Sequence, residues 1–167
     1  EGVPRETIAA AIDAMRTDRI LPFRFVTAAR YAPDFEPELE AAMLKSIAGH
    51  AKLAGKTRLL IDVSGSMDAS LSAQSEMTRL EAACGLAILA REVCDTVEIF
   101  TFSNEVKKVP PRRGFALRDA IVSSQPHGGT YLGKAVSEIT LYDVVGLDTA
   151  FYAGKVMHDA FPERTGA

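Results

Sequence analysis

The sequence has no tryptophan, only 2 cysteines among its 167 residues, and no apolar run that approaches the length of a membrane-spanning helix. Cys84 and Cys94 form neither a CxxC pair nor a cluster with histidine, so the sequence carries no cysteine–histidine zinc motif. We therefore expect two buried thiols, a cytoplasmic protein and no membrane partner. An excess of positive charge is also missing: 19 Lys and Arg face 22 Asp and Glu, and the net charge of -3 gives no global reason to expect nucleic acid binding.

The rest of the composition is that of a globular protein with one core. Hydrophobic residues make up 47% and charged residues 25% of the chain, and 12 Gly and 8 Pro are too few for a collagenous or low-complexity protein. The chain starts with Glu1 rather than with an initiator Met or a signal peptide. We therefore expect it to be part of a longer protein.

Two sequence patterns divide the chain near residue 51. Residues 4–51 repeat apolar side chains at helical spacing and predict three short amphipathic helices, as at the end of a helical repeat array. Apolar runs at 58–63 and 97–102, separated by a helical stretch at 76–94, predict a strand-helix-strand unit with a largely parallel sheet. Further along we expect an antiparallel edge strand at 106–109, helices at 118–123 and 130–139, a strand at 141–147 and a helix at 149–161.

The most informative chemistry lies in Asp62, Ser64 and Ser66, which follow the first predicted strand in a DVSGS turn. In open α/β sheets, ligands bind at the carboxyl ends of the strands. One carboxylate and two hydroxyls on a tight turn offer oxygen ligands for a hard cation such as Mg²⁺. The alternative is that these side chains only cap the following helix.

Several stretches of the chain resemble one protein family. Residues 60–67, LIDVSGSM, resemble the metal-ion-dependent adhesion site (MIDAS) that opens a von Willebrand factor A domain, and the GGT triplet at 128–130 resembles the second metal loop of that family. Residues 20–58 are similar to the junction between the helical TROVE module and the A domain of Ro autoantigen ribonucleoproteins, and residues 141–150 resemble the last strand and the start of the last helix of those proteins. The chain therefore resembles the C-terminal part of a Ro autoantigen family ribonucleoprotein.

The resemblance implies an α/β fold with two parts. Residues 1–51 would be the last helices of a TROVE or HEAT-like repeat. Residues 52–167 would be a von Willebrand A-like, Rossmann-type domain with a mostly parallel sheet flanked by helices. In the family, a further strand and an acidic metal-loop residue lie between the helix after the second metal loop and the last strand. In this sequence the predicted helix ends at residue 139 and the predicted last strand begins at residue 141, so a middle segment of the A domain is expected to be missing near residues 139–141.

The resemblance also implies a metal site and a function. Asp62, Ser64, Ser66 and Thr130 would bind a divalent metal ion, Mg²⁺ or alternatively Mn²⁺ or Ca²⁺, and an open coordination position would accept a carboxylate from a protein partner. The implied function is that of a non-enzymatic ribonucleoprotein component in RNA quality control, with no catalytic residues and no organic cofactor. Small structured non-coding RNAs of the Y type would bind mainly to the helical ring upstream.

Two alternative functions stay open. The first is a generic metal-dependent A-domain interaction module without RNA. The second is an enzyme that binds ATP or GTP through the GxxxxGK pattern from Gly128 to Lys134. The nucleotide alternative lacks two features, because Ala135 stands where a Mg²⁺-binding Ser or Thr belongs and no predicted strand precedes the loop.

A small basic cluster is the one local feature that suggests contact with a polyanion. It consists of Lys107, Lys108, Arg112, Arg113 and Arg118. Such a cluster either contacts RNA phosphate or forms a solvated edge of the sheet, and the sequence favours the solvated edge.

Overall fold

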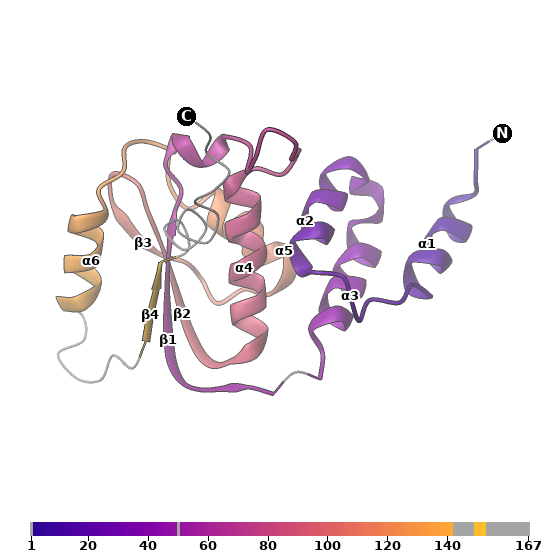
Figure 1. Ribbon diagram of the computed structural model, residues 1–167, viewed down its shortest axis with the longest axis horizontal. Helices are drawn as coiled ribbons and strands as arrows, with labels where there is room; N and C mark the ends of the chain where they lie inside the picture. Colours follow the sequence, from indigo (N-terminus) through magenta and orange to yellow (C-terminus); the bar gives the residue numbers. More distant parts are fainter. Residues whose placement is uncertain (1, 50, 142–148, 153–167) are drawn as a thin grey trace.

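The computed structural model describes residues 2–49, 51–141 and 149–152, and Figure 1 shows how its elements are layered. Three helices come first: α1 at Arg5–Asp13, α2 at Pro22–Tyr31 and α3 at Glu36–Ile47, with a 3-10 turn, η1, at Pro33–Phe35. Prolines stand in the first turns of α2, η1 and α3, where a missing N–H leaves no hydrogen bond unmade. The helical pattern predicted for residues 4–51 is confirmed.

A mixed sheet follows the helices. Its strands are β1 at Leu53–Asp62, β2 at Cys94–Phe102, β3 at Val106–Lys108 and β4 at Thr149–Tyr152, in the order β3-β2-β1-β4. β1 runs parallel to β2 and to β4, whereas β2 runs antiparallel to β3. The predicted α/β class and the antiparallel edge strand after the second long strand are therefore confirmed.

Helices cover both faces of the sheet (Figure 1). α4 at Arg79–Val93 and α5 at Gly114–Val122 lie on one face, and α6 at Leu132–Leu141 lies on the other. β1 serves both faces by strand alternation, since Leu59 and Ile61 join the core under α4 and Leu60 joins a smaller core under α6.

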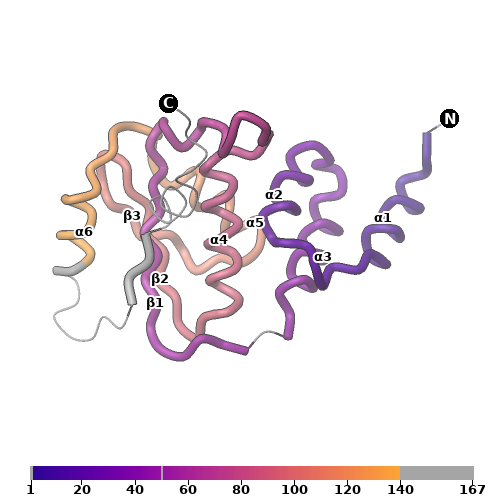
Figure 2. Tube along the Cα trace, in the orientation of Figure 1, coloured from indigo at the N-terminus to yellow at the C-terminus, as the bar shows by residue number. Residues whose placement is uncertain are grey.

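The N-terminal helices share the larger core with the sheet. Phe25 of α2, Met43 of α3 and Ile88 of α4 belong to the same buried cluster as Ile61 of β1, and Figure 2 shows α2 and α3 beside α4 and α5. α2 and α3 thus pack against α4 and α5, and through these helices they share one core with the sheet. The division of the chain into two domains near residue 51 stays a prediction.

The C-terminal end differs from the prediction. The helix expected at 149–161 is wrong at its start, because residues 149–152 form β4 beside β1. Thr, Phe and Tyr are residues that favour strands. The edge of β1 opposite β2 also offers main-chain hydrogen bonds to this segment, and this pairing decides its structure over the helical spacing of its apolar residues. The strand expected at 141–147 is wrong at its first residue, because Leu141 ends α6. Residues 142–148 and 153–167 lie outside the described part of the chain.

Both cysteines are buried free thiols, as predicted. Cys94 does not share a helix with Cys84, however, because α4 ends at Val93 and Cys94 begins β2. The other boundaries move by a few residues: β1 begins earlier than its apolar run, and α4 begins at Arg79 behind a capping box of Thr78 and Glu81.

Candidate metal centre

Asp62 is the last residue of β1, the strand at which the strand order of the sheet reverses. The chain passes from β1 to β2 on one side, whereas β4 pairs with β1 on the other side. At such a switch point, the connections leave the carboxyl ends of neighbouring strands in opposite directions and open a crevice for a ligand. The backbone N–H of Val63 donates to Phe102 O over 2.9 Å and continues the pairing of β1 with β2 past Asp62.

The polar side chains of the DVSGS turn converge. Oδ1 of Asp62 accepts a hydrogen bond from the backbone N of Ser64 over 2.8 Å, and Oγ of Ser64 lies 3.1 Å from Oγ of Ser66. Asp62 and Ser64 are buried, with 6% and 1% of their surfaces exposed, whereas Ser66 is exposed. The turn therefore presents one carboxylate and two adjacent hydroxyls at the edge of the sheet.

The second predicted loop lies against this turn. The backbone N of Gly65 donates to Gly128 O over 3.4 Å, and the backbone N of Tyr131 donates to Ser103 O over 3.1 Å. Thr130 lies between these two contacts and is exposed. The structure thus brings the segment of Thr130 to the same edge of the sheet as Asp62, Ser64 and Ser66.

Asn104 explains why glycines stand in this loop. Its Oδ1 accepts a hydrogen bond from Gly129 N over 2.8 Å. A Cβ on Gly128 would lie 2.4 Å from Asn104 Nδ2, closer than side-chain carbons approach other atoms. The sequence analysis did not single out Asn104; its only sequence signal is its position just beyond the end of β2.

Hydrogen bonds from buried hydroxyl groups of β2 and the residue that follows it fix residues 124–126, the segment that leads to the Gly128 loop. Oγ of Ser103 donates to Gln125 Oε1 and lies 2.9 Å from both that atom and Pro126 O. Nε2 of Gln125 donates to Thr101 Oγ1 over 3.2 Å, and Thr101 Oγ1 lies 2.8 Å from Ser124 Oγ. Thr101 and Ser103 are buried at the carboxyl end of β2, so residues 124–126 are fixed beside the candidate site. The sequence analysis missed this network.

The donor set fits a hard cation. Carboxylate and hydroxyl oxygens are ligands that Mg²⁺ accepts together with several waters. Within the described ranges, no group of three His, Cys, Asp or Glu side chains gathers, and Asp62 is the one carboxylate of the DVSGS turn. A divalent ion held by a single carboxylate keeps a net positive charge, which an incoming carboxylate would neutralise.

The remaining sequence candidates do not converge in this way. Nζ of Lys134 lies 3.7 Å from Glu138 Oε1 on α6, and the Gly128 loop follows α5 rather than a strand. In the basic cluster, Lys107 pairs with Glu105, Lys108 with Glu98, Arg113 with Glu92, and Arg118 with Glu36 and Asp119. These carboxylates neutralise most of the positive charge that the cluster would need in order to bind an RNA phosphate.

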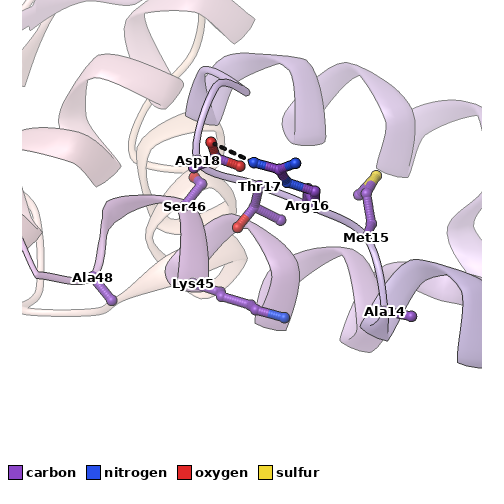
Figure 3. Close-up of a pocket in the computed structure, with 8 residues that line it drawn as sticks. All are labelled: Ala14, Met15, Arg16, Thr17, Asp18, Lys45, Ser46 and Ala48. Atoms are coloured by element: carbon purple, nitrogen blue, oxygen red, sulfur yellow. Dashed lines mark ion pairs between the residues drawn. The ribbon is translucent and has the colours of Figure 1, made fainter.

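A hollow of about 450 Å³ lies elsewhere, between the α1–α2 connection and the last turns of α3 (Figure 3). Arg16 and Asp18 meet at its rim with a 3.7 Å ion pair, and Lys45 Nζ donates to Asp13 O over 3.1 Å. Its charged groups are thus engaged within the protein, and the hollow adds nothing to the Asp62 site.

Comparison with known proteins adds no relative: no family model matches the sequence, and no curated protein matches it. Among the described helices, none combines the length and the apolar character needed to span a bilayer.

Proposed function

We propose that the chain is a non-enzymatic interaction module of the von Willebrand A type that binds a divalent metal ion. The observation that carries this proposal is the convergence of Asp62, Ser64 and Ser66 at the carboxyl end of β1, with Ser64 Oγ and Ser66 Oγ 3.1 Å apart. The donors are oxygens, so Mg²⁺ is the expected ion, with Mn²⁺ and Ca²⁺ as alternatives.

The strand order supports the proposal. One common type of doubly wound sheet has the order 3-2-1-4-5-6 and binds ligands at the switch point between strands 1 and 4. The order β3-β2-β1-β4 agrees with the first part of that order, although β3 runs antiparallel to β2, and the Asp62 turn lies at the corresponding point. The residue resemblance to the A domain and the strand order therefore favour the same site.

The site would recognise an acidic partner. Asp62 neutralises half the charge of a divalent ion, and Ser64, Ser66 and Thr130 add neutral oxygens. A carboxylate from a protein partner would complete the coordination and gain a charge-assisted bond. The chain itself would supply binding and orientation without chemical turnover.

The N-terminal helices connect this module to RNA. We propose that α1, α2 and α3 end a TROVE-type repeat, and that a cytoplasmic ribonucleoprotein containing this chain binds small structured non-coding RNA through helices upstream. The paired basic cluster on residues 107–118 agrees with this division, because it leaves RNA contact to another part of the protein.

A thermal denaturation series with Mg²⁺ or Mn²⁺ tests the metal site. Millimolar ion should raise the Tm of the wild type by about 3 °C, the shift expected when the ion exceeds its Kd roughly tenfold. Asp62→Asn keeps an oxygen that can accept from Ser64 N but removes the charge, and should lose the response. Asp95→Ala, at an exposed carboxylate of β2, should keep it. An equal shift in wild type and Asp62→Asn would refute the metal site.

The RNA connection needs a separate experiment. A longer form of the protein that includes the upstream helices should bind a small structured RNA, and the affinity should fall steeply between about 50 and 200 mM salt because phosphate contacts release counterions. Absence of such binding, with the metal response intact, would leave the generic A-domain module.

The nucleotide alternative predicts a different outcome. ATP or GTP should then raise the Tm, and Lys134→Ala should abolish that rise. Engagement of Lys134 with Glu138 and the lack of a strand before Gly128 argue against this result.

A further inference from the structure

A cleft of about 290 Å³ lies at the β3 edge of the sheet, where the chain leaves β3 and turns toward α5. Its apolar lining consists of Val97, Ile99, Val109, Pro110, Pro111 and Leu117. The four aliphatic residues of this lining are buried, so the bottom of the cleft belongs to the core. Asp62 is in register with Phe102, five residues beyond Val97. At about 3.3 Å per residue, this places the cleft roughly 16 Å along the sheet from the Asp62 site.

The edge of β2 is open beside this cleft. β3 pairs with β2 only at Phe100–Phe102, and Val109 N donates to Ile99 O over 2.8 Å just beyond that pairing. The prolines at 110–111 then end the ladder, because proline has no N–H to continue it. Residues 96–98 of β2 therefore pair with β1 on one side, while no strand of the described residues lies on the other side.

Val97 presents its main chain to this open edge. Carbonyl directions alternate along a strand: Phe102 O accepts on the β1 side, whereas Ile99 O accepts on the β3 side. Val97 comes two residues before Ile99 and thus faces the β3 side as well. Its carbonyl oxygen accepts from Nη1 of Arg91 over 3.2 Å, which is a side chain rather than a strand. A carbonyl has a second lone pair, so an extended segment can still pair with Val97.

Positive charge surrounds the apolar bottom of the cleft. Arg91, Lys108 and Arg112 line it together with one carboxylate, Glu98. Lys108 is paired with Glu98 over 2.6 Å, but Arg91 donates to a carbonyl, and Arg112 is exposed with no carboxylate partner in the described part of the chain. Guanidinium groups bind carboxylates through paired hydrogen bonds. The charges of the cleft therefore complement an acidic ligand.

The size of the cleft and the open edge indicate the kind of ligand. Pockets for drug-sized molecules have volumes of about 300 to 1,000 Å³, so a cleft of about 290 Å³ suits a single apolar side chain better. Strand addition at a sheet edge combines main-chain hydrogen bonds with pockets for alternate side chains. An RNA phosphate would use the arginines, but neither the apolar bottom nor the open edge.

We propose that the open edge of β2 at Val97 binds an extended acidic segment of a partner protein, with one apolar side chain in the cleft and carboxylates on Arg91 and Arg112. Residues two apart in a strand face the same side, so the expected pattern is an apolar residue with an acidic residue two positions before and two positions after it. This docking surface is separate from the Asp62 site and needs no metal ion.

Titration of the ¹⁵N-labelled whole chain with the blocked peptide acetyl-Glu-Thr-Leu-Thr-Glu-amide tests the proposal. Up to about 5 mM peptide covers a Kd of about 1 mM, and the amide signals of Val97, Ile99 and Val109 should shift and saturate. A peptide with Gln in place of both Glu residues should bind about tenfold more weakly, because it loses the charge-assisted bonds. N-methylation of the leucine and the next threonine removes an N–H that faces the edge in either register and should also weaken binding about tenfold.

Two matched variants locate the binding. Arg112→Met should weaken the affinity for the Glu peptide about tenfold. Arg24→Met changes the charge equally at an exposed position of α2 and should bind like the wild type. Circular dichroism checks that both variants are folded. Excess EDTA should leave the affinity unchanged, whatever the outcome of the Mg²⁺ experiment at Asp62.

Several results would overturn the proposal. These are no shift at the highest peptide concentration, shifts that map to the Gly128 loop instead of the cleft, equal affinity for the Glu and Gln peptides, and equal affinity of Arg112→Met and Arg24→Met. Loss of binding in EDTA would assign the peptide carboxylates to the metal site. Shifts at Val97 that appear on raising the concentration of the chain alone would assign the edge to a second copy of this chain.

Discussion

Arg58 and Glu98 form an ion pair across the parallel strands β1 and β2, where they are direct register partners, with 3.0 Å between Nε and Oε2. Arg58 is 5% exposed. Its Nη1 also donates to Ile139 O over 3.0 Å, near the C-terminal end of α6. One side chain thus connects two strands and the helix that covers them.

We expect Arg58→Met to lower the free energy of unfolding by about 1 to 3 kcal/mol, because it leaves the half-buried Glu98 carboxylate with Lys56 and Lys108 as its ion-pair partners and the Ile139 carbonyl without this donor. Urea denaturation measures the change. Arg112→Met, at an exposed position, should stay within about 0.5 kcal/mol of the wild type. A loss below about 1 kcal/mol in Arg58→Met would contradict the connecting role of Arg58.

Glu98 should make stability depend on acid. The hydrogen bond from Lys108 lowers the pKa of Glu98 most; burial opposes the shift, and the hydrogen bond from Arg58 adds to it, so that the pKa falls from 4.5 to about 2. Because the folded pKa lies below the unfolded value, the stabilisation is present above pH 4.5 and is lost as the pH falls toward 2. Between these limits the wild type should lose about 1 to 3 kcal/mol more than Glu98→Gln. Urea denaturation of both proteins at several pH values measures this difference. If the free energy of unfolding falls equally with pH in wild type and Glu98→Gln, the lowered pKa of Glu98 is contradicted.

Gly85 allows α2 to pack against α4. An added Cβ would lie 2.6 Å from Cβ and 2.9 Å from Cα of Phe23. We expect Gly85→Ala to lower the free energy of unfolding by about 1 to 3 kcal/mol, because the clash with backbone outweighs the better helix propensity of alanine. Gly133→Ala on α6, where a Cβ meets nothing within 4 Å, should instead be neutral or stabilise by up to about 1 kcal/mol. Equal effects of the two substitutions would mean that α2 does not approach α4 so closely.

Cys84 should be inert in the folded protein. Burial raises the pKa of its thiol to about 12, and its side chain lies within the main core, so neither thiolate nor access is available to a reagent. In a Cys94→Ala protein, which isolates Cys84, an aromatic disulfide reagent at about pH 8 should react only after denaturant is added. Rapid labelling of the native protein would contradict the burial of Cys84.

Local patterns in the sequence predicted much of the fold. The apolar run around Ile61 and the turn that follows Asp62 place a buried strand and a polar loop correctly, because neighbouring residues carry both signals. The helix predicted to start at residue 149 is wrong because residues 149–152 form a strand only by pairing with the edge of β1. That edge is distant in the sequence, since Thr149 pairs with Thr57, 92 residues earlier.

The candidate site shows the same limit. Asp62, Ser64 and Ser66 are found as a motif because they share one turn. Ser103 and Gln125 are 22 residues apart, and Asp68 and His127 are 59 residues apart, so no spacing rule brings either pair together. Only the arrangement of β1, β2 and the Gly128 loop at one sheet edge places them in contact.

Ser103 should control the order of the Gly128 loop. Its buried hydroxyl donates toward Gln125 Oε1 and Pro126 O, and Ser103→Ala would leave these acceptors without that donor. We expect a loss of about 1 to 2 kcal/mol in the free energy of unfolding, with faster amide hydrogen exchange at Gly129 and Tyr131, since the loop that carries them loses its anchor. Ser123→Ala, which removes an exposed hydroxyl bonded to Asp119 O, should change neither quantity much. Unchanged exchange at Gly129 in Ser103→Ala would show that Asn104 alone is enough to order the loop.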